Sequence, residues 1–244
     1  MKIGFTGVPP LAIIEEQKKI NPNSEWIDLD VPLSVISKHD AIDYIPETTC
    51  SVIQTILANT LEIKPNIIIA SVGDGKCDSM SFLLPIIKRL LPQIKILEVK
   101  NDNKKGYGTE ISTSNMPLLK KLEIITSLVT SPYNDVPNTQ CKPKAGFWGV
   151  PPYDFSILKL FPDQTHVFGW TRCMENKTPD NIEMELFVEQ GVPTVFYSQA
   201  FCSKNILAKE LAKKHKGLYV EADGLIDNST KEKIKAFLEL KECF

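Results

Sequence analysis

Short runs of apolar residues alternate with longer segments of mixed polarity along the whole chain. The apolar runs are rich in Ile and Val and are bounded by turn residues, which is typical of buried parallel strands. We expect strands in the run from Lys2 and at Trp26–Leu29, Asn66–Ser71, Ile94–Val99, Ala145–Trp148, His166–Gly169, Pro193–Ser198 and Leu218–Glu221. We expect helices at Leu11–Lys19, Ser51–Leu61, Ser79–Leu91, Pro117–Val129, Tyr153–Leu160, Asn181–Gln190, Lys204–His215 and Lys231–Leu240. The alternation predicts an α/β fold of mainly parallel sheets flanked by helices.

An internal repeat divides the chain into two related halves. The segments KIGFTGVPP at Lys2–Pro10 and KAGFWGVPP at Lys144–Pro152 agree at seven of nine positions, which indicates a duplicated unit. In each copy a strand is expected to end at the Gly-Val-Pro-Pro turn, and a helix to follow the prolines. The polar segment SPYNDVPNTQCKPK separates the copies. We therefore predict two Rossmann-like halves, at 1–130 and 131–244.

Composition and charge narrow the class of protein. The 244 residues are 43% hydrophobic, enough for a substantial core, and 28 Lys and Arg face 30 Asp and Glu. A net charge of −2 gives no long-range attraction for nucleic acid or an anionic membrane. No apolar run approaches the ~18 residues of a membrane span, and the N-terminus has no basic segment followed by an apolar signal region. We expect a cytoplasmic protein with no nucleic-acid or membrane partner.

The cysteines are the candidate site residues. The six are Cys50, Cys77, Cys141, Cys173, Cys202 and Cys243, and no CxxC pair occurs among them. Cys50 opens a predicted helix, while Cys77 and Cys202 lie in loops that follow strands, so all three are expected at the same edge of the fold. Three thiolates gathered there would suit one soft metal centre. The alternative is that each is a small buried apolar residue.

The ordered contexts of these cysteines resemble the family of 2-hydroxyacyl-CoA dehydratases, benzoyl-CoA reductases and double-cubane-cluster reductases. The elements that carry the resemblance are Cys50 in TTCSVIQ, the Cys-Asp pair at Cys77 in KCDSM, the Phe-Cys pair at Cys202 in QAFCSKN, and the Glu-x-Asp of YVEADG. The resemblance implies a [4Fe–4S] cluster held by Cys50, Cys77 and Cys202, with one iron left for another ligand. Members of this family are considerably longer than this chain.

Cys173, in the segment GWTRCMENKTP, is placed in the loop of the second half that corresponds to the Cys77 loop. It either serves as a fourth cluster ligand, which would close the site, or is a nearby thiol. Arg172 and Lys204 flank the candidate cluster loops and either offset the charge of a cluster or lie on the solvated surface. Cys141 and Cys243 are expected to be bystanders. No catalytic residue is assigned.

The predicted function is an oxygen-sensitive iron–sulfur protein that reduces or dehydrates a small molecule at the cluster. The chain has no P-loop and no G-x-G-x-x-G after a strand, so the resemblance implies a separate ATP-dependent activator that donates electrons. We expect a homodimer or a related second subunit to cover the cluster loops. The alternatives are a non-redox two-half isomerase or racemase, because ASVGDGKCDS after a strand also resembles the loop of the Asp/Glu and hydantoin racemases, and a protein that carries a metal or cofactor for maturation. In those racemases the catalytic cysteines stand at the strand ends, where this chain has Ser71 and Trp170.

Overall fold

The computed structural model describes residues 1–244 except 33–38, 74–75, 106–109, 132–135 and 180. The chain folds into two compact units, Met1–Asn103 and Lys104–Phe244. Each unit contains one four-stranded sheet in which every neighbouring pair of strands is parallel. The predicted α/β class with two Rossmann-like halves is therefore confirmed.

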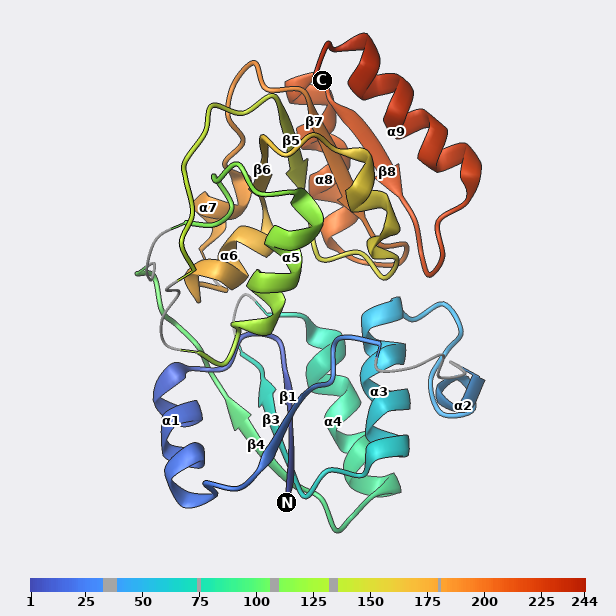
Figure 1. Ribbon diagram of the computed structural model, residues 1–244. Coiled ribbons are helices and arrows are strands. Elements are labelled where there is room, and N and C mark those ends of the chain that lie inside the picture. Colours follow the sequence, from blue (N-terminus) through green and yellow to red (C-terminus); the bar gives the residue numbers. More distant parts are fainter. Residues whose placement is uncertain (33–38, 74–75, 106–109, 132–135, 180) are drawn as a thin grey trace. The chain divides into compact units, whose positions relative to one another are not determined.

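The first unit has a sheet with the strand order β2-β1-β3-β4. In chain order its elements are β1 (Lys2–Thr6), α1 (Leu11–Ile20), β2 (Glu25–Asp28), α2 (His39–Ile42), α3 (Ser51–Ile63), β3 (Ile67–Ser71), α4 (Asp78–Leu90) and β4 (Lys95–Val99). Helix α1 covers one face of the sheet, and α3 and α4 lie side by side on the other (Figure 1). At the carboxyl ends of the strands, side chains therefore point either toward α1 or toward α3 and α4.

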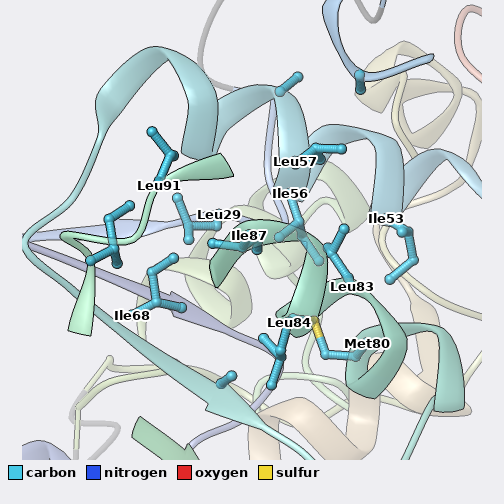
Figure 2. Packing of buried hydrophobic residues seen from close by; sticks show 14 of the residues in the cluster. Leu29, Ile53, Ile56, Leu57, Ile68, Met80, Leu83, Leu84, Ile87 and Leu91 are labelled. Carbon is cyan, nitrogen blue, oxygen red and sulfur yellow. The ribbon is translucent and has the colours of Figure 1, made fainter. Parts of the chain in front are cut away.

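The core between the sheet and helices α3 and α4 is built from Leu and Ile side chains. Leu29 and Ile68 lie on this face of the sheet and pack with Ile56 of α3 and Leu83 of α4 (Figure 2). Ala70 belongs to the same cluster. Complete burial of one such Leu or Ile contributes about 1.5–3 kcal/mol. Burial on this face fixes which residues of β1, β2 and β3 point toward α3 and α4, because successive residues of a strand point to opposite faces.

The second unit repeats this topology with the strand order β6-β5-β7-β8. Its elements are α5 (Leu118–Ser127), β5 (Ala145–Trp148), η1 (Phe155–Leu160), β6 (Thr165–Phe168), α6 (Trp170–Asn176), α7 (Ile182–Leu186), β7 (Thr194–Ser198), α8 (Lys204–His215), β8 (Leu218–Glu221) and α9 (Asn228–Leu240). Its core is more aromatic: the ring of Phe147 stacks on Tyr197 and meets Phe161 edge-on. The equal strand order in both sheets agrees with the duplication predicted from the repeat.

The structure corrects two of the predicted helices in the second unit. The segment predicted as the helix Tyr153–Leu160 is the short 3-10 helix η1, which begins where the Asp154 side chain accepts a hydrogen bond from the Ser156 amide at 2.9 Å. The helix predicted at Asn181–Gln190 ends at Leu186, beyond which Phe187 is extended. The Phe187 ring contacts Phe168, with ring centroids 6.1 Å apart, and this tertiary contact competes with continuation of the helix.

Helix α6 lies where the sequence predicted a loop. Gly169 turns the chain with a φ of +72° and no side chain caps the helix locally. Instead, Thr171 donates two hydrogen bonds to the carbonyl oxygen of Gly149, from its amide at 3.0 Å and from its hydroxyl at 2.8 Å. The start of α6 is thus fixed by the neighbouring turn, a tertiary interaction that local sequence patterns do not reveal.

Helix α5 belongs to the second unit. Its Leu118 and Leu122 are buried in one cluster with Ala145 and Phe147 of β5. The compact units divide between Asn103 and Lys104, whereas the sequence analysis placed the division at residue 130.

A glycine follows the central strand of each unit at equivalent positions of the repeat. Gly7 has a φ of +62°, and a Cβ added to it would lie 3.2 Å from the Cβ of Ser71. Gly149 has a φ of +150°, and an added Cβ would lie 2.3 Å from the carbonyl oxygen of Tyr197. In both units the turn after the first strand therefore runs very close to the end of the third strand.

We expect Gly149→Ala to destabilise the protein far more than Gly191→Ala. Both glycines have positive φ, but nothing lies within 4 Å of a Cβ added at Gly191, where φ is +79°. Gly191→Ala should cost about 1–2 kcal/mol from backbone strain alone, whereas the added clash with a backbone oxygen should take Gly149→Ala beyond about 3 kcal/mol. Urea unfolding measures both. Equal costs would contradict the close approach.

Candidate functional site

In each sheet, the second and third strands along the chain lie on opposite sides of the first strand. From β1 the chain crosses to β2 on one side and later to β3 on the other, and β5 has the same relation to β6 and β7. In open parallel sheets, ligands bind beyond the carboxyl ends of the strands at such a switch point. A functional site is therefore expected at the turns after β1 and β5 and at the loops after β3 and β7.

Cys50 and Cys77 head the two helices that cover one face of the first sheet. Cys50 is the N-cap of α3 and Cys77 the N-cap of α4, and neither sulfur accepts a capping hydrogen bond. Cys50 is half-buried and packs against the Leu and Ile cluster, whereas Cys77 is exposed. The N-terminus of a helix carries a partial positive charge and backbone amides without intrahelical partners, so both sulfurs lie where an anionic group can be held.

Two buried hydroxyl groups on the same face have no hydrogen-bond partner. Thr6 pairs in register with Ala70, so its side chain points toward the layer of α3 and α4. Ser51 is the first residue of α3 and directly follows Cys50. The Oγ1 of Thr6 and the Oγ of Ser51 are both buried and unsatisfied. A buried unsatisfied hydroxyl costs about 1–3 kcal/mol, so each invites an acceptor that the chain itself does not supply.

The opposite face of the first sheet carries two aspartates at the end of β2. The Gly7 amide donates to Oδ2 of Asp30 at 2.6 Å, and the Asp30 amide donates to Oδ1 of Asp28 at 3.0 Å. Burial raises the pKa of Asp30 to about 6. The pKa of Asp28 is raised well above its usual value, first by burial and then by the charge of Asp30. Although part of each residue reaches the surface, Oδ1 of Asp30 is buried and has no hydrogen-bond partner.

Cys202 occupies the connection of the second unit that corresponds to the Cys77 connection of the first. It lies between β7 and α8, directly before the N-cap residue Ser203, as Cys77 lies between β3 and α4. The half-buried Cys202 forms a turn in which its amide donates to the Gln199 carbonyl at 3.3 Å. The preceding Phe201 has a φ of +58° and is 64% exposed. Left-handed backbone at an aromatic residue stores strain beside this cysteine.

Cys173 does not have the predicted position. It lies in α6 after β6, and β6 corresponds to β2, so Cys173 is not the counterpart of Cys77. Its side chain is buried, and its thiol donates a weak hydrogen bond to the Asn181 carbonyl at 3.8 Å. Burial raises the pKa of the Cys173 thiol to about 12. A neutral thiol inside the core is poorly suited to binding a metal.

The two cationic residues predicted to flank the site each have an acidic partner. Arg172 pairs with both carboxylate oxygens of Glu110, at 2.8 and 2.7 Å. Lys204 forms an ion pair with Glu185, and its ammonium lies 4.8 Å from the centroid of the Trp170 ring. These contacts hold the start of α8, directly after Cys202, against α6 and α7.

A Cys-His-Glu group in the second unit was missed by the sequence analysis. The Sγ of Cys141 lies 3.9 Å from Nε2 of His166, whose Nδ1 lies 3.5 Å from Oε2 of Glu189. The Cys141 thiol donates to the Ser114 carbonyl at 3.2 Å, however, and His166 Nε2 lies 3.0 Å from the Cys141 carbonyl oxygen, which can only accept. The imidazole nitrogen beside the sulfur is therefore a donor and cannot take the thiol proton. Burial also raises the pKa of Cys141 and lowers that of His166, so this group holds the chain segments together.

Within the described residues, no three His, Cys, Asp or Glu side chains form a metal-binding group. The half-buried Asp28 and Asp30 were also missed, although the segment EWIDLD places two aspartates at a predicted strand end. Comparison with protein-family models and with curated proteins finds no match to this chain. The resemblance noted in the sequence therefore stays a prediction.

None of the described helices is both long and apolar enough to cross a membrane.

The burial of the thiols predicts their order of chemical modification. We expect iodoacetamide at about pH 8 to label the exposed Cys77 in the native protein and to leave Cys173 unlabelled until the chain unfolds, because thiolate is the reactive form. Peptide mass spectrometry after timed alkylation measures this order. Cys243, which is also buried, is the control for core protection. Rapid native labelling of Cys173 would contradict its placement.

The raised pKa of Asp30 predicts how stability changes with pH. The folded state binds this proton more tightly than the unfolded chain, so the Asp30 contribution favours folding below about pH 4 and is lost as the pH rises through about 6. Relative to wild type, Asp30→Asn should therefore become progressively more stable across this window. Urea unfolding at several pH values measures the difference. Asp102→Asn, at an aspartate whose side chain is 62% exposed, should show no such trend, and the same flat profile for Asp30→Asn would contradict the assignment.

Proposed function

We propose that this chain is a [4Fe–4S] protein whose cluster is bound by Cys50, Cys77 and Cys202, and that a small molecule is reduced or dehydrated at the cluster. The observation that carries the proposal is the pairing of Cys50 and Cys77 at the N-termini of α3 and α4, on the face with two unsatisfied buried hydroxyls. The proposal requires Cys202 of the second unit to complete the ligand set.

The residues of the first unit fit a cluster in three respects. The N-termini of α3 and α4 carry a partial positive charge and supply backbone amides that can donate to cluster sulfur. The unsatisfied hydroxyls of Thr6 and Ser51 are donors for an acceptor such as a cluster sulfide. The exposure of Cys77 leaves room for a group beyond the helix end. A bound [4Fe–4S] cluster supplies one-electron transfer and, where only three cysteines ligate it, an iron open to a further ligand.

The burial of Cys173 favours a cluster in which one iron has no cysteine ligand. Its thiol is buried in the second unit with a pKa near 12, so deprotonation and exposure of this side chain would both cost free energy. With Cys50, Cys77 and Cys202 as the only cysteine ligands, one iron keeps an exchangeable position. We therefore prefer a catalytic cluster over a closed electron carrier.

The proposed partners and compartment follow from the same chemistry. All six cysteines are thiols, which suits a reducing cytoplasm. A low-potential cluster needs an electron donor, for which we propose a separate ATP-dependent activator. A second copy of the chain, or a related subunit, would shield the exposed Cys77 side of the site from solvent.

We expect serine substitution at Cys50, Cys77 or Cys202 to remove most of the bound iron. The change replaces a soft thiolate by a hydroxyl, which binds iron–sulfur clusters weakly. The measurement is iron and acid-labile sulfide per chain after anaerobic purification and reconstitution, together with visible absorption. Cys141→Ser is the matched control, because the sulfur of Cys141 is committed to backbone contacts in the second unit, and it should keep a full cluster.

Cys173→Ala should also keep the full cluster. Loss of iron in this variant would show that Cys173 is the fourth ligand and would overturn the open site. A colourless wild-type protein with no labile sulfide after reconstitution would overturn the cluster itself, and the isomerase and carrier alternatives would then be the ones to test.

A further inference from the structure

Three residues form a polar row at the carboxyl edge of the first sheet. Phe5 pairs with Asp28 of β2 and with Ile69 of β3, so two residues further along Asp30, Gly7 and Ser71 lie side by side. Contacts confirm this extension of the register. The Gly7 amide donates to Asp30 at 2.6 Å, and a Cβ at Gly7 would lie 3.5 Å from the Ser71 hydroxyl oxygen. The row faces away from α3 and α4, because Thr6, one residue before Gly7, faces toward them.

Each of the two polar side chains of this row has one oxygen without a hydrogen-bond partner. Oδ1 of Asp30 and Oγ of Ser71 are buried and have no hydrogen-bond partner. Ser71 is only 6% exposed. Gly7 has no side chain, so the carboxylate and the hydroxyl flank it from the two neighbouring strands. Two buried, unsatisfied groups in one row, at the switch point of the sheet, are an arrangement for binding a ligand.

The second unit shows that the fold does not need these groups. The repeat aligns Phe5 with Phe147, and the strand registers then align the remaining positions. The first-unit residues Asp28, Asp30 and Ser71 correspond to Val167, Gly169 and Tyr197 of the second unit. The hydroxyl of Tyr197 is satisfied, since it donates to the Ala222 carbonyl at 3.2 Å. At these positions the second unit therefore has neither a carboxylate nor an unsatisfied serine.

The charge of the site indicates what it binds. Asp28 lies on the same face as Asp30, one row below it, and each carboxylate raises the cost of ionising the other. Among the described residues, no lysine or arginine pairs with either aspartate. A neutral hydroxyl donor would satisfy the hydrogen bonds but leave the buried charge uncompensated. A cation that also donates hydrogen bonds satisfies both requirements.

We propose that Asp30 and Ser71, supported by Asp28, bind the protonated amino group of a small ligand at the carboxyl end of β1. An ammonium group has three donors and no acceptor, which matches Oδ1 of Asp30, the Ser71 hydroxyl and the Asp28 carboxylate. A magnesium ion fits less well, because it requires near-octahedral oxygen ligation and keeps several waters. The site lies on the face of the sheet opposite Cys50 and Cys77, so it does not depend on the proposed cluster.

The test uses the Gly7 amide of the 244-residue chain as the reporter in two-dimensional ¹H–¹⁵N NMR. Methylammonium chloride is the probe. We expect it to shift the Gly7 resonance saturably in wild type, and we expect Ser71→Ala and Asp30→Asn each to weaken the apparent affinity about tenfold or more, as for a lost charge-assisted hydrogen bond. Tetramethylammonium chloride, which has no N–H donor, and methanol, which has no charge, should leave the resonance unchanged.

The matched control is Thr6→Val, which removes a buried unsatisfied hydroxyl from the other face of the same strand and should keep wild-type affinity for methylammonium. Cys77→Ser should do the same, so loss of the cluster and loss of the amine site are distinguishable. The proposal fails if methylammonium gives no saturable shift, if the Ser71 and Asp30 variants bind as wild type does, or if tetramethylammonium acts equally. A saturable response to magnesium chloride alone would replace the amine site by a metal site.

Discussion

The close passage of the first strand's turn beside the third strand is the constraint on which both units depend. At Gly7 and Gly149 the backbone has positive φ, and a side chain would meet the end of the neighbouring strand. Because the glycine has no side chain, the polar side chains at the switch point come from the two neighbouring strands. The glycine therefore sets where a ligand can approach, while the adjoining strands decide the chemistry that it meets.

The two units share this constraint and differ in what surrounds it. In the second unit Val167 and Tyr197 take the equivalent positions, and Phe147 stacks on Tyr197 in a packed aromatic core. In the first unit Asp28 and Ser71 take these positions, and the Ser71 hydroxyl and Oδ1 of the neighbouring Asp30 remain unsatisfied at a cost in stability. Buried polar groups that a sister unit omits are best explained by function, since stability alone would favour apolar residues there.

The strands were predictable from the sequence because each is a short apolar run that must be buried on both faces. The prediction failed where tertiary contacts decide the outcome. Helix α6 begins through hydrogen bonds from Thr171 to Gly149, and Cys173 consequently lies inside a helix and not in a loop. The sequence could name Cys50 and Cys77 as candidates from their positions before helices. It could not reveal that Oδ1 of Asp30 is buried without a partner, because an aspartate at the end of a strand usually lies in a solvent-exposed turn.

The two candidate sites of the first unit lie at one edge of one sheet but on its opposite faces. Cys50 and Cys77 lie with α3 and α4, whereas Asp30 and its row face the other way. A thiolate-ligated cluster and a pair of carboxylates are both anionic, and buried like charges repel one another strongly. The intervening sheet keeps them apart, and a bound ammonium would remove the excess negative charge from the carboxylate side. The two sites share no residue, and each can therefore be removed by substitution without removing the other.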